Sequence, residues 1–116
     1  MPYIRVATSQ NWTEQQMNDL KAGLAAATTL IPGKTEAALM IELDHGRDMY
    51  FQGIKRELAY VDAKFSGCIE LEYKQRFTVA VFQLLKEVCQ LADDAVYVTC
   101  SEFDSWGTRG ELKMRK

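Results

Sequence analysis

The two halves of the chain repeat one pattern, in which a β-like run is followed by an amphipathic helix and a second β-like run. Tyr60 in the second half corresponds to Tyr3 in the first, and Asp94 corresponds to Glu36. The β-like runs either alternate polar and apolar residues or are apolar and rich in β-formers, as strands are. These runs are residues 3–8, 37–43, 58–65 and 95–100.

Between the runs of each half, apolar residues recur at helical spacing. Thr13 and Gln16 form a Thr-x-x-Gln capping box that predicts the start of the first helix, and Pro32-Gly33 is predicted to end it. The two apolar stripes are Met17, Leu20, Leu24, Ala27 and Ile31, and then Phe77, Val81, Leu84, Val88 and Leu91.

Two such units indicate a single α/β (α+β) domain over residues 1–116, a duplicated β-α-β fold with pseudo-repeats at about 1–57 and 58–116. We expect a four-stranded mixed sheet with two helices on one face, because a helix between two strands implies their parallel pairing by a right-handed crossover. A ferredoxin-like βαββαβ fold has the same element order, and periodicity does not separate the two. The strands carry apolar residues on both faces, so we expect another copy of the chain to cover the face without helices.

Composition excludes several classes of function. The net charge of −2 and the 26% of charged residues give no electrostatic case for binding nucleic acid or an anionic membrane. Residues 1–12 contain no apolar signal-peptide core, and no apolar run approaches the roughly 20 residues of a membrane span. We therefore expect a cytoplasmic protein that does not contact a membrane.

Cysteine and histidine usage argues against a metal site. Cys68, Cys89 and Cys100 are widely spaced and lack a Cys-x-x-Cys pair, which favours reduced, buried thiols over disulfides or a zinc site. His45 is the only histidine. We expect neither a metal nor an organic cofactor.

Several short motifs occur in a characteristic order along the chain. They are Met1-Pro2, Gly33-Lys34, Phe51-Gln52-Gly53, Ser66-Gly67 and Asp94-Ala95-Val96-Tyr97-Val98. Together with the duplicated βαβ pattern, they resemble the tautomerase superfamily over nearly the whole chain, and most closely its macrophage migration inhibitory factor branch. The resemblance implies a homotrimer in which three sheets form a central barrel and the active sites lie between subunits.

The resemblance implies that Pro2 is the catalytic residue. Removal of Met1, which a small second residue permits, would expose a secondary amine, and desolvation or a nearby cation lowers the pKa of such an amine. A neutral amine takes a proton beside a carbonyl and returns it elsewhere on the enol, which is tautomerisation. If Met1 were retained, the Pro2 nitrogen would be an amide without basicity.

The same resemblance assigns substrate-binding roles near this proline. Lys34 would bind a substrate carboxylate and help to keep Pro2 neutral, and the backbone N–H of Ser66 would approach the substrate. Lys64 lies two residues earlier on the same strand face. It is a candidate second carboxylate contact, although an exposed lysine is the commoner case.

Other substrate-binding roles fall near the C-terminus. Tyr97 would reach into the neighbouring subunit's site and polarise a carbonyl or enol oxygen. Thr99 stands where migration inhibitory factors carry an amide, which leaves the substrate preference open. Trp106, with Phe103, would supply an aromatic wall.

These residues predict a keto–enol tautomerase, an isomerase acting on a small 2-oxo acid such as phenylpyruvate. Asn11-Trp12 and Met40 stand where the oxalocrotonate and dehalogenase branches carry arginines, which disfavours those specialised activities. The changes at Thr99 and in the loop 54–58 favour an alternative, a trimeric binding or signalling protein with vestigial activity. A third reading is a monomeric or dimeric ferredoxin-like module that binds a small ligand.

Overall fold

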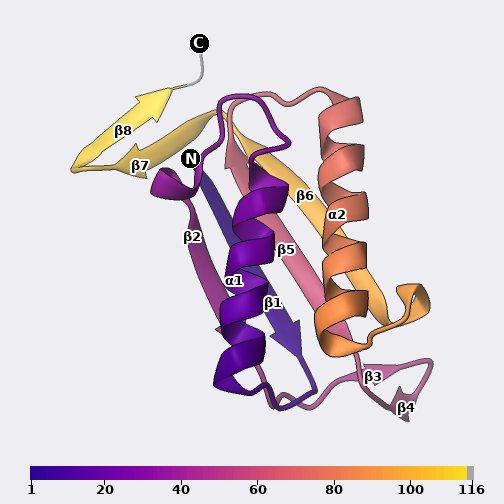
Figure 1. Cartoon of the computed structure of the whole chain (residues 1–116). Helices are drawn as coiled ribbons and strands as arrows, with labels where there is room; N and C mark the ends of the chain where they lie inside the picture. Colours follow the sequence, from indigo (N-terminus) through magenta and orange to yellow (C-terminus); the bar gives the residue numbers. More distant parts are fainter. Residues whose placement is uncertain (115–116) are drawn as a thin grey trace.

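The computed structural model describes residues 1–114, and its main feature is a four-stranded sheet with two helices lying across one face (Figure 1). The predicted four-stranded mixed sheet is confirmed. Its strands are β1 (Pro2–Thr8), β2 (Met40–Asp44), β5 (Ala59–Ser66) and β6 (Val96–Phe103), and the helices are α1 (Glu14–Thr28) and α2 (Leu71–Cys89).

The strand order β2-β1-β5-β6 decides between the two folds that the sequence left open. β1 pairs with β2 in parallel and β5 pairs with β6 in parallel, while β1 and β5 meet antiparallel at the centre. The two strands of each half are therefore direct neighbours, whereas a ferredoxin-like fold splits them with a third strand. The chain has the duplicated βαβ arrangement.

The capping box forms as predicted, but α1 is shorter than expected. The Thr13 hydroxyl accepts from the Gln16 amide at 3.1 Å, and the Gln16 side chain accepts from the Thr13 amide at 2.9 Å. The helix ends at Thr28, ahead of Pro32-Gly33. The cause is a pair of β-branched threonines, Thr28 and Thr29, whose hydroxyls donate back to carbonyl oxygens of the last turn.

Several short elements differ from the sequence prediction. Residues 36–38 form a 3-10 helix, η1 (Glu36–Ala38), so β2 begins only at Met40. The high helix propensity of Ala37 and Ala38 accounts for this shift. A second 3-10 helix, η2 (Asp93–Ala95), directly precedes β6. Two hairpins were not predicted, one of β3 (Tyr50–Phe51) with β4 (Ile54–Lys55) and one of β7 (Ser105–Thr108) with β8 (Glu111–Met114).

The core lies between the sheet and the two helices. Its centre is the edge-to-face pair of Phe65 on β5 and Phe77 on α2, with ring centroids 5.5 Å apart and both side chains fully buried. All three cysteine thiols are free, but Cys68 is exposed rather than buried because it lies in the loop beyond β5. Within residues 1–114, no helix is both long enough and apolar enough to span a membrane.

The uncovered face of the sheet is more polar than expected. At its centre Arg5 pairs with Glu42 and Asp44, and Lys64 pairs with Asp62. Strand alternation places these charged residues opposite the core. Large apolar side chains remain exposed toward the ends of this face, namely Met40 at 67% and Tyr97 at 64%. The expectation of an apolar second face therefore holds only at the ends.

Candidate functional site

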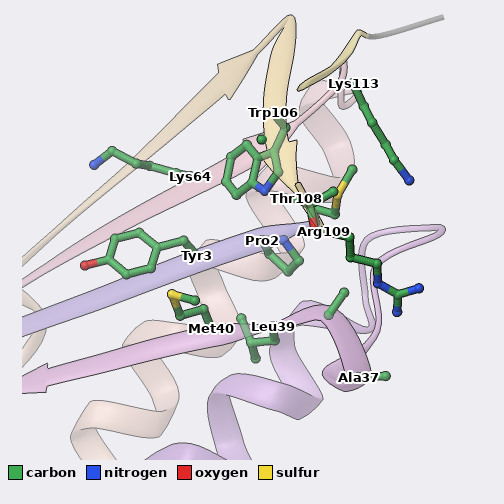
Figure 2. A pocket seen from close by; sticks show the side chains of 13 residues that line it. Pro2, Tyr3, Ala37, Leu39, Met40, Lys64, Trp106, Thr108, Arg109 and Lys113 are labelled. Carbon is green, nitrogen blue, oxygen red and sulfur yellow. The ribbon is translucent and has the colours of Figure 1, made fainter. Parts of the chain in front are cut away.

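A pocket of about 740 Å³ opens beside the start of β1 (Figure 2). Three parts of the chain line it: the N-terminal residues 1–3 with Lys64 of β5, the segment 37–40, and the β7–β8 hairpin. Figure 2 shows Trp106 on one side of Pro2 and the apolar pair Leu39 and Met40 on the other. The pocket is therefore apolar beside the proline and carries polar groups around it.

Three of the predicted site regions meet at the N-terminus. Lys34 Nζ donates to the Ser66 carbonyl oxygen at 2.7 Å, and the Ser66 amide donates to the Met1 carbonyl oxygen at 3.1 Å. Burial, followed by the nearby Lys34 cation, lowers the pKa of the Met1 amine from 8.0 to about 6. The chain's N-terminal amine is thus mostly neutral at pH 7.

Pro2 itself is buried and pairs with Phe65 at the edge of the pocket. Its fixed φ suits the extended strand, and its ring lies on the core face of β1 with Ile4. Since Met1 precedes it here, its nitrogen is an amide. The strand places this nitrogen next to the desolvated terminus.

The aromatic residues proposed as a wall lie together. Trp106 lines the pocket, and its ring meets that of Phe103 edge-on with centroids 6.1 Å apart. Lys64 also lines the pocket, where its ammonium donates to Asp62 and lies 5.9 Å from the ring centroid of Tyr3. Lys64 therefore has a partner, as a structural lysine would.

Tyr97 and Thr99 lie away from this pocket. Tyr97 is level with Tyr60, which pairs with Ala7, so it lies about 17 Å from Pro2 when measured along β1 at ~3.3 Å per residue. Its ring meets Phe51 edge-on, and the Thr99 hydroxyl lies 2.7 Å from the Tyr60 hydroxyl. One chain therefore does not bring Tyr97 or Thr99 to Pro2.

Two cationic residues at the pocket, Arg109 and Lys113, were not predicted from the sequence. Arg109 and Gly110 are the two loop residues of the β7–β8 hairpin, with φ of 51° and 80°. A glycine between two short β-like runs is the signal that would have found this turn. Arginine in place of the usual asparagine or aspartate weakened that signal.

The arrangement has the parts needed for proton transfer on an anionic carbonyl compound. It offers a desolvating environment for an N-terminal amine, cations to hold an anion, and an apolar wall to exclude water. The groups lie at one end of the sheet and are held by β1, β5 and the C-terminal hairpin.

The family model described as macrophage migration inhibitory factor (MIF) matches residues 1–111. No curated protein matches the chain.

Solved structures share its fold at low sequence identity. MIF2 of Leishmania major is 20% identical, with a TM-score of 0.90 over 97% of each chain. Pt0534 inactivated by 2-oxo-3-pentynoate is 14% identical, with a TM-score of 0.85 over 93% of each chain. A fused 4-OT described as an asymmetric trimer is 16% identical, with a TM-score of 0.85 over 94% of each chain.

Proposed function

The chain belongs to the macrophage migration inhibitory factor family, and on this premise we propose that it is a cytoplasmic, cofactor-independent keto–enol tautomerase. Its proposed substrate is a small 2-oxo acid such as phenylpyruvate. Pro2, freed by the removal of Met1, is the general base. The structure of Pt0534, whose fold is similar to that of this chain, was solved after inactivation by a 2-oxo acid, and this supports the proposed substrate class.

The observation that carries the proposal is the environment of the N-terminal amine. Burial and the Lys34 cation lower the pKa of the Met1 amine to about 6. After removal of Met1, burial and the Lys34 cation would also lower the pKa of the Pro2 amine. A secondary amine that burial and a nearby cation keep neutral at pH 7, and that a rigid strand holds in place, is a suitable base for a carbon acid.

Met1 also occupies groups that the substrate would use. Its carbonyl oxygen accepts the Ser66 amide hydrogen, which is the donor assigned to the substrate. Removing Met1 would therefore expose the Pro2 nitrogen and free the Ser66 donor in one step. Lys34, held at 2.7 Å from the Ser66 carbonyl, would bind the substrate carboxylate beside the base.

In the proposed reaction, Pro2 nitrogen takes a proton from the carbon next to the carbonyl, and the electron pair moves to the carbonyl oxygen. The enol forms when that oxygen gains a proton, and the reverse steps return the keto form. Tyr97, whose side chain is 64% exposed, would donate to this oxygen from a neighbouring subunit. We therefore propose a homotrimer, and the similar fused 4-OT is described as an asymmetric trimer.

The test is an ultraviolet assay of phenylpyruvate enol for the wild type, Pro2→Gly and Lys34→Ala. We expect Pro2→Gly to reduce kcat/KM by about 10²–10⁴-fold, the usual contribution of general acid–base catalysis. Lys21→Ala, on the exposed side of α1, is the control and should leave the rate unchanged. Equal rates for the wild type, Pro2→Gly and Lys34→Ala would contradict the proposal and favour a binding protein with vestigial activity.

A further inference from the structure

The β7–β8 hairpin brings to the pocket two cations that the proposed reaction does not use. Arg109 and Lys113 both line it, along with Lys64, and its lining within residues 1–114 includes no carboxylate side chain. The chain as a whole carries a net charge of −2, so this positive character is local. An excess of one sign in a pocket attracts ligands of the opposite sign.

Among the residues that the structure describes, neither Arg109 nor Lys113 forms an ion pair. Lys64, in contrast, is paired with Asp62. Glu111 lies across the hairpin from Thr108, yet it does not line the pocket. An anion bound by Arg109 and Lys113 would supply the opposite charge that these two side chains lack among residues 1–114.

The backbone holds Arg109 in a conformation that arginine disfavours. With φ of 51° at Arg109 and 80° at Gly110, the loop has the positive angles of a type I′ turn, whose first position prefers asparagine, aspartate or glycine. Residues held against their local preference cluster at functional sites. The turn places Arg109 among the residues that line the pocket, with its side chain extending away from Pro2 (Figure 2).

The position of Lys113 is set by the pairing of β8 with β7, the strand that carries Trp106. Lys113 lies directly opposite Trp106 in the hairpin register, so the two side chains share one face. In Figure 2, Arg109 and Lys113 lie on one side of Pro2, and Lys64 lies on the other. The two cations of the hairpin therefore lie on the same side of Pro2, apart from the Lys64–Asp62 pair.

We propose that Arg109 and Lys113 bind a second carboxylate, so that the substrate is a 2-oxo dicarboxylic acid. This inference rests on the proposed function, in which Lys34 binds the first carboxylate beside Pro2. The planar guanidinium of Arg109 matches a carboxylate with two parallel hydrogen bonds, and Lys113 adds a point charge. An aryl 2-oxo acid such as phenylpyruvate would leave both cations without a partner.

The kinetic test compares the enol forms of 2-oxosuccinate and phenylpyruvate as substrates. The variants are Arg109→Asn and Lys113→Gln, with Lys21→Gln as the control. Losing one charged hydrogen bond should lower kcat/KM for the dicarboxylate by about tenfold to a hundredfold. Phenylpyruvate turnover should change by less than about twofold, because it makes no such bond. An equal loss on both substrates, or no loss on either, would overturn the inference.

Arg109→Asn also separates a binding role from a structural one. Asparagine suits the left-handed first position of this turn better than arginine does, so the variant should unfold at the same urea concentration or a higher one. Arg109→Lys keeps the charge and should restore part of the dicarboxylate activity. A destabilised Arg109→Asn protein with equal losses on both substrates would assign Arg109 a structural role instead.

A binding measurement tests the carboxylate site separately from the proposed catalytic base. If Pro2→Gly matches the wild type on both substrates, the proposed base is wrong, whatever the hairpin does. Binding of 2-oxosuccinate, followed by calorimetry, does not depend on turnover. The inference predicts weaker binding in both hairpin variants than in Lys21→Gln, and equal affinities would overturn it.

Discussion

The ammonium of Lys34 donates a 2.7 Å hydrogen bond to the carbonyl oxygen of Ser66. This bond joins the loop after α1 to the end of β5, and it holds a cation beside the N-terminal amine. The cation disfavours the protonated amine and so helps to lower its pKa. The amine and its neighbouring cation can therefore be tested together.

Replacing Lys34 with alanine should shift the pH dependence of the reaction. Lys34 contributes to the lowered pKa of the Met1 amine, and we expect it to act in the same way on the Pro2 amine of the processed protein, so the pKa of that amine should rise without the cation. The midpoint of kcat/KM against pH, measured by enol disappearance, should therefore move to higher pH than in the wild type. Lys21→Ala should keep the wild-type midpoint, and an unmoved midpoint in Lys34→Ala would contradict the role of Lys34.

Tyr97 should act on the site of another subunit. Pro2→Gly and Tyr97→Phe should each lower activity when alone, and mixing the two unfolded proteins before refolding should restore some of it. Random assembly at equal amounts gives roughly a quarter of the sites both native residues, if each site takes Pro2 and Tyr97 from different subunits. Tyr97 acting within its own chain would give no recovery.

Thr8 should be important for stability because its hydroxyl is fully buried. It donates to the Leu58 carbonyl oxygen at 2.8 Å and accepts the Gln10 amide at 3.1 Å. Thr8→Val removes both bonds at nearly constant volume, and we expect a loss of about 1–3 kcal/mol in the free energy of unfolding. Urea titrations at one protein concentration would measure it. Thr29→Val, at an exposed hydroxyl, should lose less than about 0.5 kcal/mol.

The capping box offers a second stability test at the start of α1. Thr13→Ala removes the side-chain cap of the helix and should lower the free energy of unfolding by about 0.5–2 kcal/mol. Thr35 precedes η1 but makes no side-chain cap bond, so Thr35→Ala is a matched control with an effect within about 0.5 kcal/mol. Equal losses in the two variants would show that the Thr13 bond adds nothing.

Much of the fold was predictable because its signals are local and repeated. The Thr13–Gln16 capping box and the helical stripes predict α1 and α2, and the duplicated pattern predicts four strands. The ends of helices and strands were harder to predict from the sequence. At the end of α1, for example, the Thr28 hydroxyl donates a hydrogen bond to a backbone carbonyl oxygen of the helix. The two-residue strands of the β3–β4 hairpin are too short to show a period.

The candidate site was only partly accessible from sequence. The structure brings Lys34 and Ser66 together with the N-terminus, and Trp106 lines the same pocket. Arg109 and Lys113 were missed because their contribution depends on a hairpin turn that starts with arginine rather than asparagine. Tyr97 and Thr99 stay predictions, because their proposed partners lie in another subunit.

The most direct test of the central claim compares two forms of the same sequence, one without Met1 and one that keeps it. The second form is made in cells whose methionine aminopeptidase is inhibited, and intact mass identifies each form. The account predicts rapid loss of phenylpyruvate enol with the processed protein. When Met1 is retained and the Pro2 nitrogen is an amide, it predicts that the rate falls by about a hundredfold or more. Equal rates for the two forms would contradict the claim that Pro2 is the base.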